Sequence, residues 1–526
     1  MSRVRVEQGT LEGNERRGVR RFRGVPYAAP PVGDLRWASP QPPVPWQGVR
    51  DATEFGPAAI QSVDLGLDLG AEPSEDCLYL NVWTTSVSPE ARQPVMVWIH
   101  GGGFLNWSGS MRDYHGSSIA QRGVTYVSFN YRLGAFGFLQ HPDADGNAAV
   151  QDWVAALEWV SRNIAQFGGD PANVTVFGQS AGADAVRTLL ATPSARGLFH
   201  RAILQSAGAE ALAARRGPSR RERLLAVSAR FCEQLGGSDL EYLRTRPVQE
   251  VRRASLMSAS VVPPPGQVHT PANLVWAPTE DGQVVGEDLS CWDPEISVLF
   301  GHTRDEGRFF VRPTGPYGGP PAGVDPAAIY TPTTLENMVA ILGGEQADAI
   351  LAQLDGSPYE ALARVFTDAL WTEPVLASYG RFTELGRTSY AYRFDRVSPG
   401  NRASDMLAFH CAEIPYVFGH ISAGQGYDEQ DVRVSETMLH AWTEFARTGA
   451  PRSPDGTPWP AADATAPQVT VIDAETHSRP LEIDPVTELI HKLRATDGTY
   501  SATDHSGPAV RSARLPARGR FDQLGA

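Results

Sequence analysis

One short segment in the first half of the chain restricts the possible folds more than any other. Residues 173–177 form an apolar, strand-like run, and residues 181–190 have the composition of a helix. Between them lies a Gly-x-Ser-x-Gly turn made of Gly178, Gln179, Ser180, Ala181 and Gly182. A strand that passes through such a turn into a helix holds the serine on a tight bend, and the flanking glycines permit close backbone packing. The segment therefore predicts an α/β protein in which the Ser180 hydroxyl projects above the end of a strand.

The helix after this turn indicates what the serine could do. Its N-terminus brings free N–H groups and the positive end of the helix dipole next to the hydroxyl. A negatively charged tetrahedral intermediate would form at this place. The pentapeptide alone is a weak signal, because a chain with 51 glycines can contain it as an ordinary turn. The strand before it and the helix after it favour a catalytic interpretation.

Other apolar runs predict a large, mostly parallel sheet. Near-continuous hydrophobic segments are typical of strands covered on both faces, and here they alternate with segments of helical spacing such as 150–167. The strand-like runs are 78–84, 94–100, 124–131, 173–177, 200–206, 296–301 and 389–394. Strands that alternate with helices indicate parallel pairing through right-handed crossovers. Ahead of them, residues 4–25 contain three β-like runs that predict a small antiparallel sheet.

The length of 526 residues, without a low-complexity linker inside the chain, favours one large domain over residues 1–494. The segments 209–285 and 306–385 have the pattern of helical insertions between late strands. We expect such insertions to cap the site and to shape its pocket. The polar tail, residues 495–526, shows little periodicity and is expected to be a loosely ordered or surface extension.

Composition excludes several classes of partner. The net charge of −14 argues against binding to nucleic acid or to an anionic membrane surface. The N-terminus lacks the apolar core of a signal peptide, and no stretch of about 18 apolar residues could span a membrane. The four cysteines are widely spaced, without a metal-ligand pattern, and fit a reducing compartment. We expect a cytoplasmic protein without a metal or organic cofactor; the mature form of a secreted protein is the alternative.

A second glycine-rich turn follows the strand-like run that begins at residue 94. It has the sequence His-Gly-Gly-Gly-Phe over residues 100–104. Consecutive glycines leave backbone N–H groups free, and such a loop accompanies a nucleophile elbow in lipases and esterases. We expect the N–H groups of Gly102, Gly103 and Ala181 to form an oxyanion hole. A flexible turn or an anion-binding nest for phosphate is the alternative.

The candidates for a general base and its orienting acid lie downstream. His410 stands out in a loop-like stretch, and the chain order serine, acid, histidine is the order of sites built on this elbow. Glu306 follows a strand-like run and is the candidate acid, with the adjacent Asp305 as its rival. Composition alone does not select His410 over other histidines, namely His302, His420 and His440.

Four longer motifs resemble those of the type-B carboxylesterases, the family of bacterial para-nitrobenzyl esterases, animal carboxylesterases and cholinesterases. Residues 167–182 are similar to the nucleophile signature of this family, and residues 75–82 to its second signature. Residues 130–139 and 442–451 match as well, and the matches extend from about residue 4 to about residue 490. The resemblance implies an α/β-hydrolase fold with a large central sheet, flanking helices and helical cap insertions.

The resemblance also implies a role for individual residues. The family acid is the glutamate of an Asp-Glu-Gly run, which falls on Glu306, and the base lies three positions before Glu-Ile-Pro-Tyr, which falls on His410. A serine in the strand after the elbow, which helps to hold the acid, falls on Ser206. Together with Ser180 as the nucleophile, these residues imply a Ser-His-Glu triad.

Two departures from the family pattern bear on function. Members from secretory compartments usually pair the cysteine at Cys77 with one about 20 residues earlier, and no cysteine stands there in this chain. The implied absence of this disulfide supports an intracellular or bacterial protein. The elbow commonly carries glutamate before the serine, whereas this chain has Gln179. Without that carboxylate we do not expect a cholinesterase-like preference for cationic substrates.

The sequence thus predicts a serine carboxylesterase that hydrolyses neutral, apolar or aryl esters through an acyl-enzyme. A specialised hydrolase of carbamates, amides or bulky synthetic esters is the nearer alternative, and a non-catalytic adhesion-type relative is disfavoured because all three triad positions are filled. We expect a small-molecule ester as the partner and a monomer or weak homo-oligomer. Several aromatic residues are candidates for the pocket and equally for core packing: Trp107, Tyr114, Phe309, Phe310 and Phe409.

Overall fold

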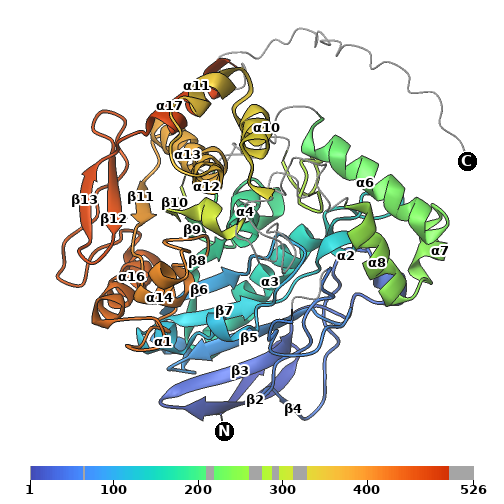
Figure 1. The fold of residues 1–526 in the computed structure, drawn as a ribbon. Helices are drawn as coiled ribbons and strands as arrows, with labels where there is room; N and C mark the ends of the chain where they lie inside the picture. Colours follow the sequence, from blue (N-terminus) through green and yellow to red (C-terminus); the bar gives the residue numbers. More distant parts are fainter. Residues whose placement is uncertain are drawn as a thin grey trace, which may run out of the picture.

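A large twisted sheet forms the centre of the molecule (Figure 1). The computed structural model describes residues 2–62, 66–208, 218–259, 275–286, 295–311 and 329–496. Within these residues the sheet has 13 strands in the order β1-β2-β3-β5-β7-β6-β8-β9-β10-β11-β12-β13, with β4 beside β2. The strands are β1 (Ser2–Val6), β2 (Gly9–Arg16), β3 (Val19–Pro26), β4 (Val49–Asp51), β5 (Tyr79–Thr84), β6 (Gln93–Ile99), β7 (Thr125–Phe129), β8 (Gly169–Gln179), β9 (Arg201–Gln205), β10 (Ser297–Thr303), β11 (Ser389–Phe394), β12 (Gln468–Ile472) and β13 (His477–Pro480).

Strand pairing confirms the mostly parallel sheet. All neighbours from β7 through β6, β8, β9, β10 and β11 to β12 are parallel. The pairs β1–β2, β2–β3, β3–β5 and β5–β7 are antiparallel, as are β12 and β13. The N-terminal strands are therefore antiparallel as predicted, and they continue the central sheet because β3 pairs with β5.

The helices cover both faces of this sheet and extend beyond one of its ends. The α-helices are α1 (Ser117–Gln121), α2 (Gly134–Phe138), α3 (Ala148–Asn163), α4 (Ala181–Leu190), α6 (Arg220–Leu235), α7 (Leu240–Arg244), α8 (Val248–Ser258), α10 (Pro332–Gly343), α11 (Ala347–Leu351), α12 (Pro358–Thr367), α13 (Glu373–Glu384), α14 (Pro399–Ala403), α15 (Ile414–Val417), α16 (Glu429–Thr448) and α17 (Pro485–Thr496). Two short elements reach the site, the 3-10 helix η7 (Glu306–Phe309) and the π-helix η9 (Asp368–Thr372).

Each central strand is buried on both faces because its alternate side chains enter two different cores. In β6, Val97 and Ile99 belong to the core that contains residues of α3 and α4. Met96 and Trp98, between and beside them, belong to the core that contains residues of α1 and α16. This arrangement explains why the strand reads as a continuous hydrophobic run in the sequence.

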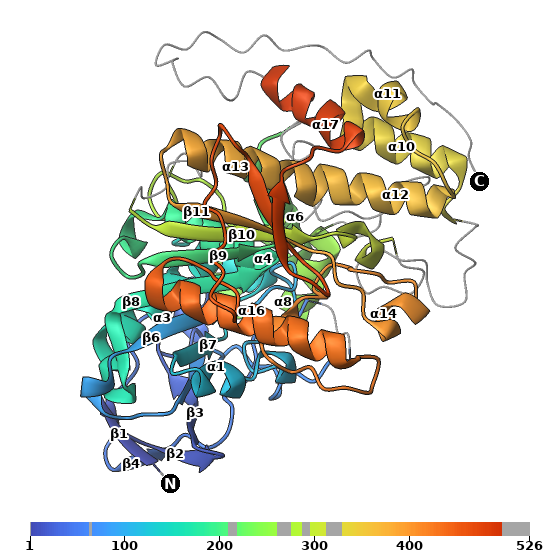
Figure 2. The same cartoon turned by 90° about the vertical axis from the view of Figure 1, so that its left-hand side faces the viewer.

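The predicted insertions contain two groups of helices. In Figure 1, α6, α7 and α8 lie together beside α2, while α10–α13 and α17 gather at the end of the sheet near β10 and β11; Figure 2 shows this second group from the side. A capping box begins α6, where Ser219 and Glu222 bond each other's backbone, and Ser357 with Glu360 does the same for α12. Parts of both insertions (209–217, 260–274 and 312–328) lie outside the described residues, as does 497–526 of the predicted extension.

Candidate active site

Ser180 lies on the sharp turn between β8 and α4, as predicted. Its backbone angles are φ 58° and ψ −127°, a conformation that a residue with a side chain rarely adopts. The Ser180 N–H donates to the carbonyl of Gln205 on the neighbouring strand at 2.9 Å, and the Ser180 carbonyl accepts from Asp184 in the first turn of α4 at 3.0 Å. The strained turn is thus held on both sides by regular structure.

Gly182 is required by the packing of this turn. A Cβ atom at this position would lie 2.0 Å from the carbonyl oxygen of Ile99, the last residue of β6. The elbow therefore contacts the backbone that leads into the glycine-rich loop. A Cβ on Gly101 would lie 3.3 Å from the Cβ of Ser180, which puts the start of that loop beside the serine.

The histidine and the glutamate selected from the sequence contact each other. His410 lies in the loop before α15, and its Nδ1 makes a short hydrogen bond to Oε2 of Glu306, the first residue of η7. Both side chains are buried, with exposed fractions of 2% and 0%. The second oxygen of Glu306 accepts from the Thr303 N–H at 2.8 Å. The carboxylate is thereby fixed at the end of β10.

Asp305, the alternative acid, has a different set of partners. Its carboxylate accepts from the Arg304 guanidinium, at 2.9 Å in the closest contact, and from the backbone N–H of Ala408 at 3.0 Å. Its own N–H donates to the carbonyl of Ala408 at 2.9 Å. Asp305 therefore anchors the loop that carries His410, while Glu306 faces the imidazole.

The immediate surroundings determine the charge on Glu306. Burial alone would raise the pKa of Glu306, but the electrostatic interaction and the hydrogen bond with His410 outweigh burial and lower that pKa, with smaller contributions from His302 and Ser206. Ser206 follows β9 in a left-handed conformation, φ 55°, and its buried hydroxyl makes no full hydrogen bond to any described group. The acid is ionised and oriented toward the base.

The Nε2 atom of His410 faces an amide instead of the serine. It lies 3.2 Å from Nε2 of Gln179, and among the described residues no hydrogen bond joins it to the Ser180 hydroxyl. Hydrogen bonds thus connect Glu306, His410 and Gln179. Ser180 lies beside this group because it directly follows Gln179 in the elbow.

The glycine-rich loop has a left-handed backbone at two glycines and leaves their N–H groups without acceptors among the described residues. Gly102 and Gly103 have φ values of +93° and +64°, and a Cβ on Gly102 would lie 2.2 Å from the carbonyl oxygen of Asn106. No described group accepts a hydrogen bond from the N–H of Gly102, Gly103 or Ala181. These amides can therefore receive an oxygen of a bound molecule. His100, before the loop, stacks on Tyr131 with ring centroids 4.4 Å apart, and burial lowers its pKa to about 3.

Aromatic side chains surround the imidazole. The ring centroids of Phe310, Trp371 and Phe309 lie 5.1, 5.2 and 5.8 Å from that of His410. Phe309 also stacks on Phe409, with centroids 6.1 Å apart. Of the five aromatic candidates, Trp107, Phe309 and Phe409 are partly exposed. Phe310 is buried beside His410, and Tyr114 is buried against Trp98.

Some residues of the site were not assigned a role from the sequence. Trp371 belongs to η9, and π-helices are rare elements that often occur at functional sites. Glu413 is fully buried, accepts from Gln205 Nε2 at 3.2 Å, and has its pKa raised to about 7 by burial and then by the charge of Glu306. Its place three residues after His410 is a signal that could have drawn attention to it.

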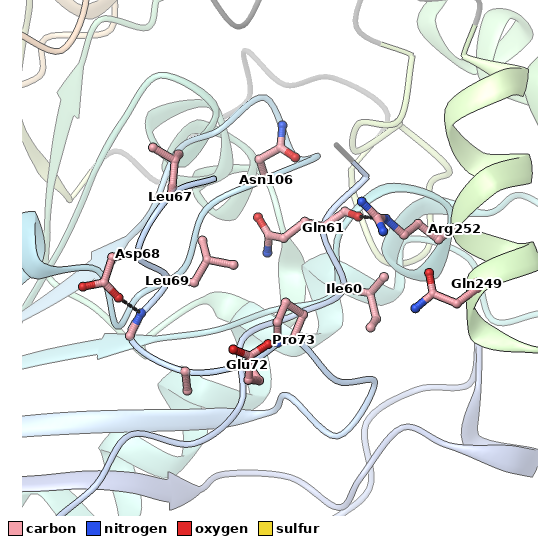
Figure 3. A pocket seen from close by; sticks show the side chains of 12 residues that line it. Ile60, Gln61, Leu67, Asp68, Leu69, Glu72, Pro73, Asn106, Gln249 and Arg252 are labelled. Atoms are coloured by element: carbon pink, nitrogen blue, oxygen red, sulfur yellow. Dashed lines mark hydrogen bonds between the residues drawn. The ribbon is translucent and has the colours of Figure 1, made fainter. Parts of the chain in front are cut away.

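A separate cavity of about 730 Å³ borders the chain after the glycine-rich loop (Figure 3). Its lining includes Gln61, whose Nε2 donates to the carbonyl of Trp107 at 3.0 Å, and Arg252, which donates to the carbonyl of Gln61 at 2.8 Å. In Figure 3, Asp68 lies on the side of the cavity away from Arg252, and Glu72 lies beside Pro73. The described lining contains none of the three triad candidates, so the cavity is a neighbour of the site and not the site itself.

A strained serine at the end of a parallel strand, with a carboxylate–histidine pair on later loops, defines an α/β-hydrolase enzyme. Comparison with known proteins identifies the group within that class. The profile of the Carboxylesterase family matches residues 1–487, and the chain belongs to this family. It is a carboxylic-ester hydrolase with serine hydrolase machinery.

Individual relatives are similar over almost the whole chain. The para-nitrobenzyl esterase of Bacillus subtilis (strain 168) is 34% identical over 518 residues, which cover 94% of this chain and 99% of the relative. The phenmedipham hydrolase of Pseudarthrobacter oxydans is 36% identical over 492 residues, 89% of this chain and 94% of the relative. Among solved structures, a carboxylesterase of Geobacillus stearothermophilus aligns with a TM-score of 0.76 at 30% identity, covering 93% of this chain and all of its own.

The described residues form neither a membrane-spanning helix nor a metal site. No described helix combines the length and apolar character needed to cross a membrane. Within the same residues, no cluster of histidine, cysteine or acidic side chains has the arrangement of a metal site.

Proposed function

We propose that Ser180, His410 and Glu306 act as the catalytic triad of this esterase. Nδ1 of His410 donates to Glu306, which fixes the tautomer with the lone pair on Nε2. His410 takes the proton of Ser180 as the serine oxygen attacks the ester carbonyl, and Glu306 stabilises the imidazolium. His410 then gives that proton to the leaving alcohol, and water repeats the sequence on the acyl-enzyme.

In this proposal the N–H groups of Gly102, Gly103 and Ala181 bind the oxyanion. Their lack of acceptors among the described residues supports this role, since preorganised donors stabilise the charge that develops in the transition state. The loss of one such donor typically reduces kcat by about 10²–10³-fold. Ser206 lies beside the acid, Glu306, and Gln179 contacts the base, His410, and we propose that both help to position the triad.

The contact between His410 and Glu306 carries the proposal. It joins two residues 104 positions apart in the sequence, both buried, at the end of the strand next but one to the elbow. A buried carboxylate–imidazole pair beside a strained serine has a direct chemical use in nucleophilic catalysis. The aromatic rings around His410 favour neutral, apolar or aryl esters as substrates.

A second candidate function has some support from the relatives. Proteins of nearly equal identity to this chain are named para-nitrobenzyl esterase, phenmedipham hydrolase and fumonisin B1 esterase. Because the same machinery serves different substrates, a specialised hydrolase of carbamates, amides or bulky synthetic esters is the alternative. A panel of aryl esters, carbamates and anilides compared by kcat/KM separates the two.

The Ser180→Ala variant tests the triad. We expect kcat to fall by about 10⁴–10⁶-fold while the unfolding temperature and circular dichroism spectrum are retained. An organophosphonate should label wild-type protein on Ser180 and leave the variant unlabelled. Ser404→Ala, which changes an exposed hydroxyl, is the matched control. Hydrolysis by Ser180→Ala at the wild-type rate would exclude the serine mechanism.

We also propose a cytoplasmic protein that acts as a monomer or weak homo-oligomer on small-molecule esters. The free thiols of Cys77, Cys232 and Cys411 support a reducing compartment, and Cys291 lies outside the described residues. Fractionation of the native source and light scattering test these two points.

A further inference from the structure

The amide of Gln179 occupies the position on His410 that the reaction needs. When Nδ1 of His410 donates to Glu306, an imidazole in its neutral form has its lone pair on Nε2. Nε2 of Gln179 lies 3.2 Å from that atom and is a donor only. The amide therefore donates to the same lone pair that must accept the proton of Ser180.

The orientation of this amide is fixed from its other end. The thiol of Cys411 donates to Oε1 of Gln179 at 3.3 Å. Burial raises the pKa of Cys411 well above its usual range, and the charges of Glu413 and Glu306 raise it further, so the thiol keeps its proton. Rotating the amide by 180° would place its oxygen against the lone pair of His410. The two contacts therefore specify one orientation of Gln179, whose side chain is fully buried.

We propose that Gln179 is a positioning residue which, held by Cys411, donates to Nε2 of His410 in the resting enzyme and keeps the base neutral until substrate arrives. This inference rests on the proposed triad and goes beyond it. The bond exists only while Nε2 has a free lone pair, because an imidazolium has no acceptor. The hydrogen bond from Gln179 therefore favours neutral His410 over the imidazolium. This preference opposes protonation of His410 at acidic pH and also in the transition state.

The other groups that face His410 are the same in wild type and variants. Glu306 approaches from η7 and Glu413 from the turn before α15, while Phe309, Phe310 and Trp371 add uncharged rings. Glu413 titrates near neutral pH on its own account. Each measurement below is therefore repeated in a Glu413→Gln background, so that a change in the pH profile reports on residue 179.

The test is the pH dependence of kcat/KM for a neutral aryl ester. Gln179→Met keeps the length of the side chain without the donor, and we expect its acid limb to move up by about 0.5–1 pH unit, which is a loss of about 3- to 10-fold at acidic pH. At pH 8.5 the same variant should exceed wild type by about 2- to 5-fold, since the competing bond is absent. Gln179→Glu places a carboxylate beside Nε2 of His410, which favours the imidazolium. This variant should move the acid limb up by at least about one pH unit. Acid limbs that stay in place or move down would overturn the inference.

Variants at Cys411 test how the amide is held. Cys411→Ala removes the donor to Gln179 and should move the acid limb in the same direction as Gln179→Met by a smaller amount. Cys411→Ser supplies a hydroxyl donor and should restore the wild-type profile. A merely structural role would show no such rescue. Phosphonate labelling of Ser180 in wild type keeps the two proposals apart, because its failure would remove the triad, whereas labelled protein with unmoved limbs removes only the role of Gln179.

Discussion

Two carboxyl groups near the imidazole are buried to the same extent, and their pKa values are shifted in opposite directions. Glu306 makes a short hydrogen bond to His410 and has a lowered pKa. Glu413 has only the amide of Gln205 as a side-chain partner, and its pKa is raised to about 7. The same residue type thus has a lowered pKa at one site and a raised pKa at the other, because the electrostatic interactions and hydrogen bonds that favour the ionised form differ between the two sites.

Replacing Glu413 with glutamine should change how stability depends on pH. Its pKa is raised from 4.5 to about 7 in the folded protein, so the native state holds a proton that the unfolded chain releases. The resulting contribution to stability is complete below about pH 4.5 and is lost as the pH rises through about 7. We expect Glu413→Gln to be more stable than wild type at pH 8 by about 2–4 kcal/mol, with little difference at pH 4.5. Urea unfolding at both pH values measures this, with the exposed Glu345→Gln as the control; equal stabilities at pH 8 would contradict it.

The nucleophile was predictable from local sequence, whereas its surroundings were not. Ser180 stands in a strand–turn–helix pattern that can be read from residues 173–190. Glu306 and His410 were selected by family motifs, since nothing local distinguishes Glu306 from Asp305. Glu413 and Trp371 reach the site from separate elements, and their roles depend on tertiary contacts that no single stretch of sequence contains.

At the scale of elements, the central strands were predictable and their neighbours were less so. Predicted runs such as 389–394 coincide with β11, because burial on both faces produces continuous hydrophobic sequence. Strands β12 and β13 were not assigned from the sequence. They lie at the edge of the sheet, where β13 has largely exposed side chains and little pattern. The union of the N-terminal strands with the central sheet depends on the long-range pair β3–β5.

A buried ion pair joins α17 to the start of α13, which directly follows the element that carries Trp371. Glu373, at the start of α13 directly after η9, is fully buried and receives two hydrogen bonds from Arg494 at 2.6 Å and one from His491 at 2.9 Å. Burial alone would raise the pKa of Glu373, but these bonds outweigh burial and lower it. The cost of burying the ionised Glu373 carboxylate is therefore offset by hydrogen bonds from two residues of α17.

Arg494→Met should therefore destabilise the protein more than the loss of one surface charge would. The variant leaves a buried carboxylate without its main partner, and we expect a loss of about 3–5 kcal/mol in the free energy of unfolding. The double variant Glu373→Gln/Arg494→Met should recover most of that loss, since no charge remains uncompensated. Urea denaturation of both proteins decides the matter, and equal losses in the single and double variants would contradict the role of the pair.

At the scale of the whole molecule, the two cores share one sheet and the helices at its end complete the site. The family match ends at residue 487, and the described part of the chain ends with α17 at Thr496. The helix contacts η9, α11 and α13 through the core that includes Val486, Ile490 and Leu493. Helix α17 therefore supports η9, which carries Trp371, one of the aromatic residues around His410.

Two truncations test this view of the C-terminus. We expect a chain ending at Thr496 to keep kcat/KM within about twofold of the 526-residue chain, because the contacts of α17 with the other described helices are retained. A chain ending at Asp484 loses the whole helix, which exposes the apolar face of its core and removes both partners of Glu373. That shorter chain should unfold at a lower temperature than the chain ending at Thr496. It should also lose esterase activity at a lower temperature, since η9 with Trp371 loses its contacts with α17. Thermal inactivation compared with phosphonate labelling of Ser180 measures both effects. Equal inactivation temperatures for the two truncated chains would show that α17 has no part in holding the site.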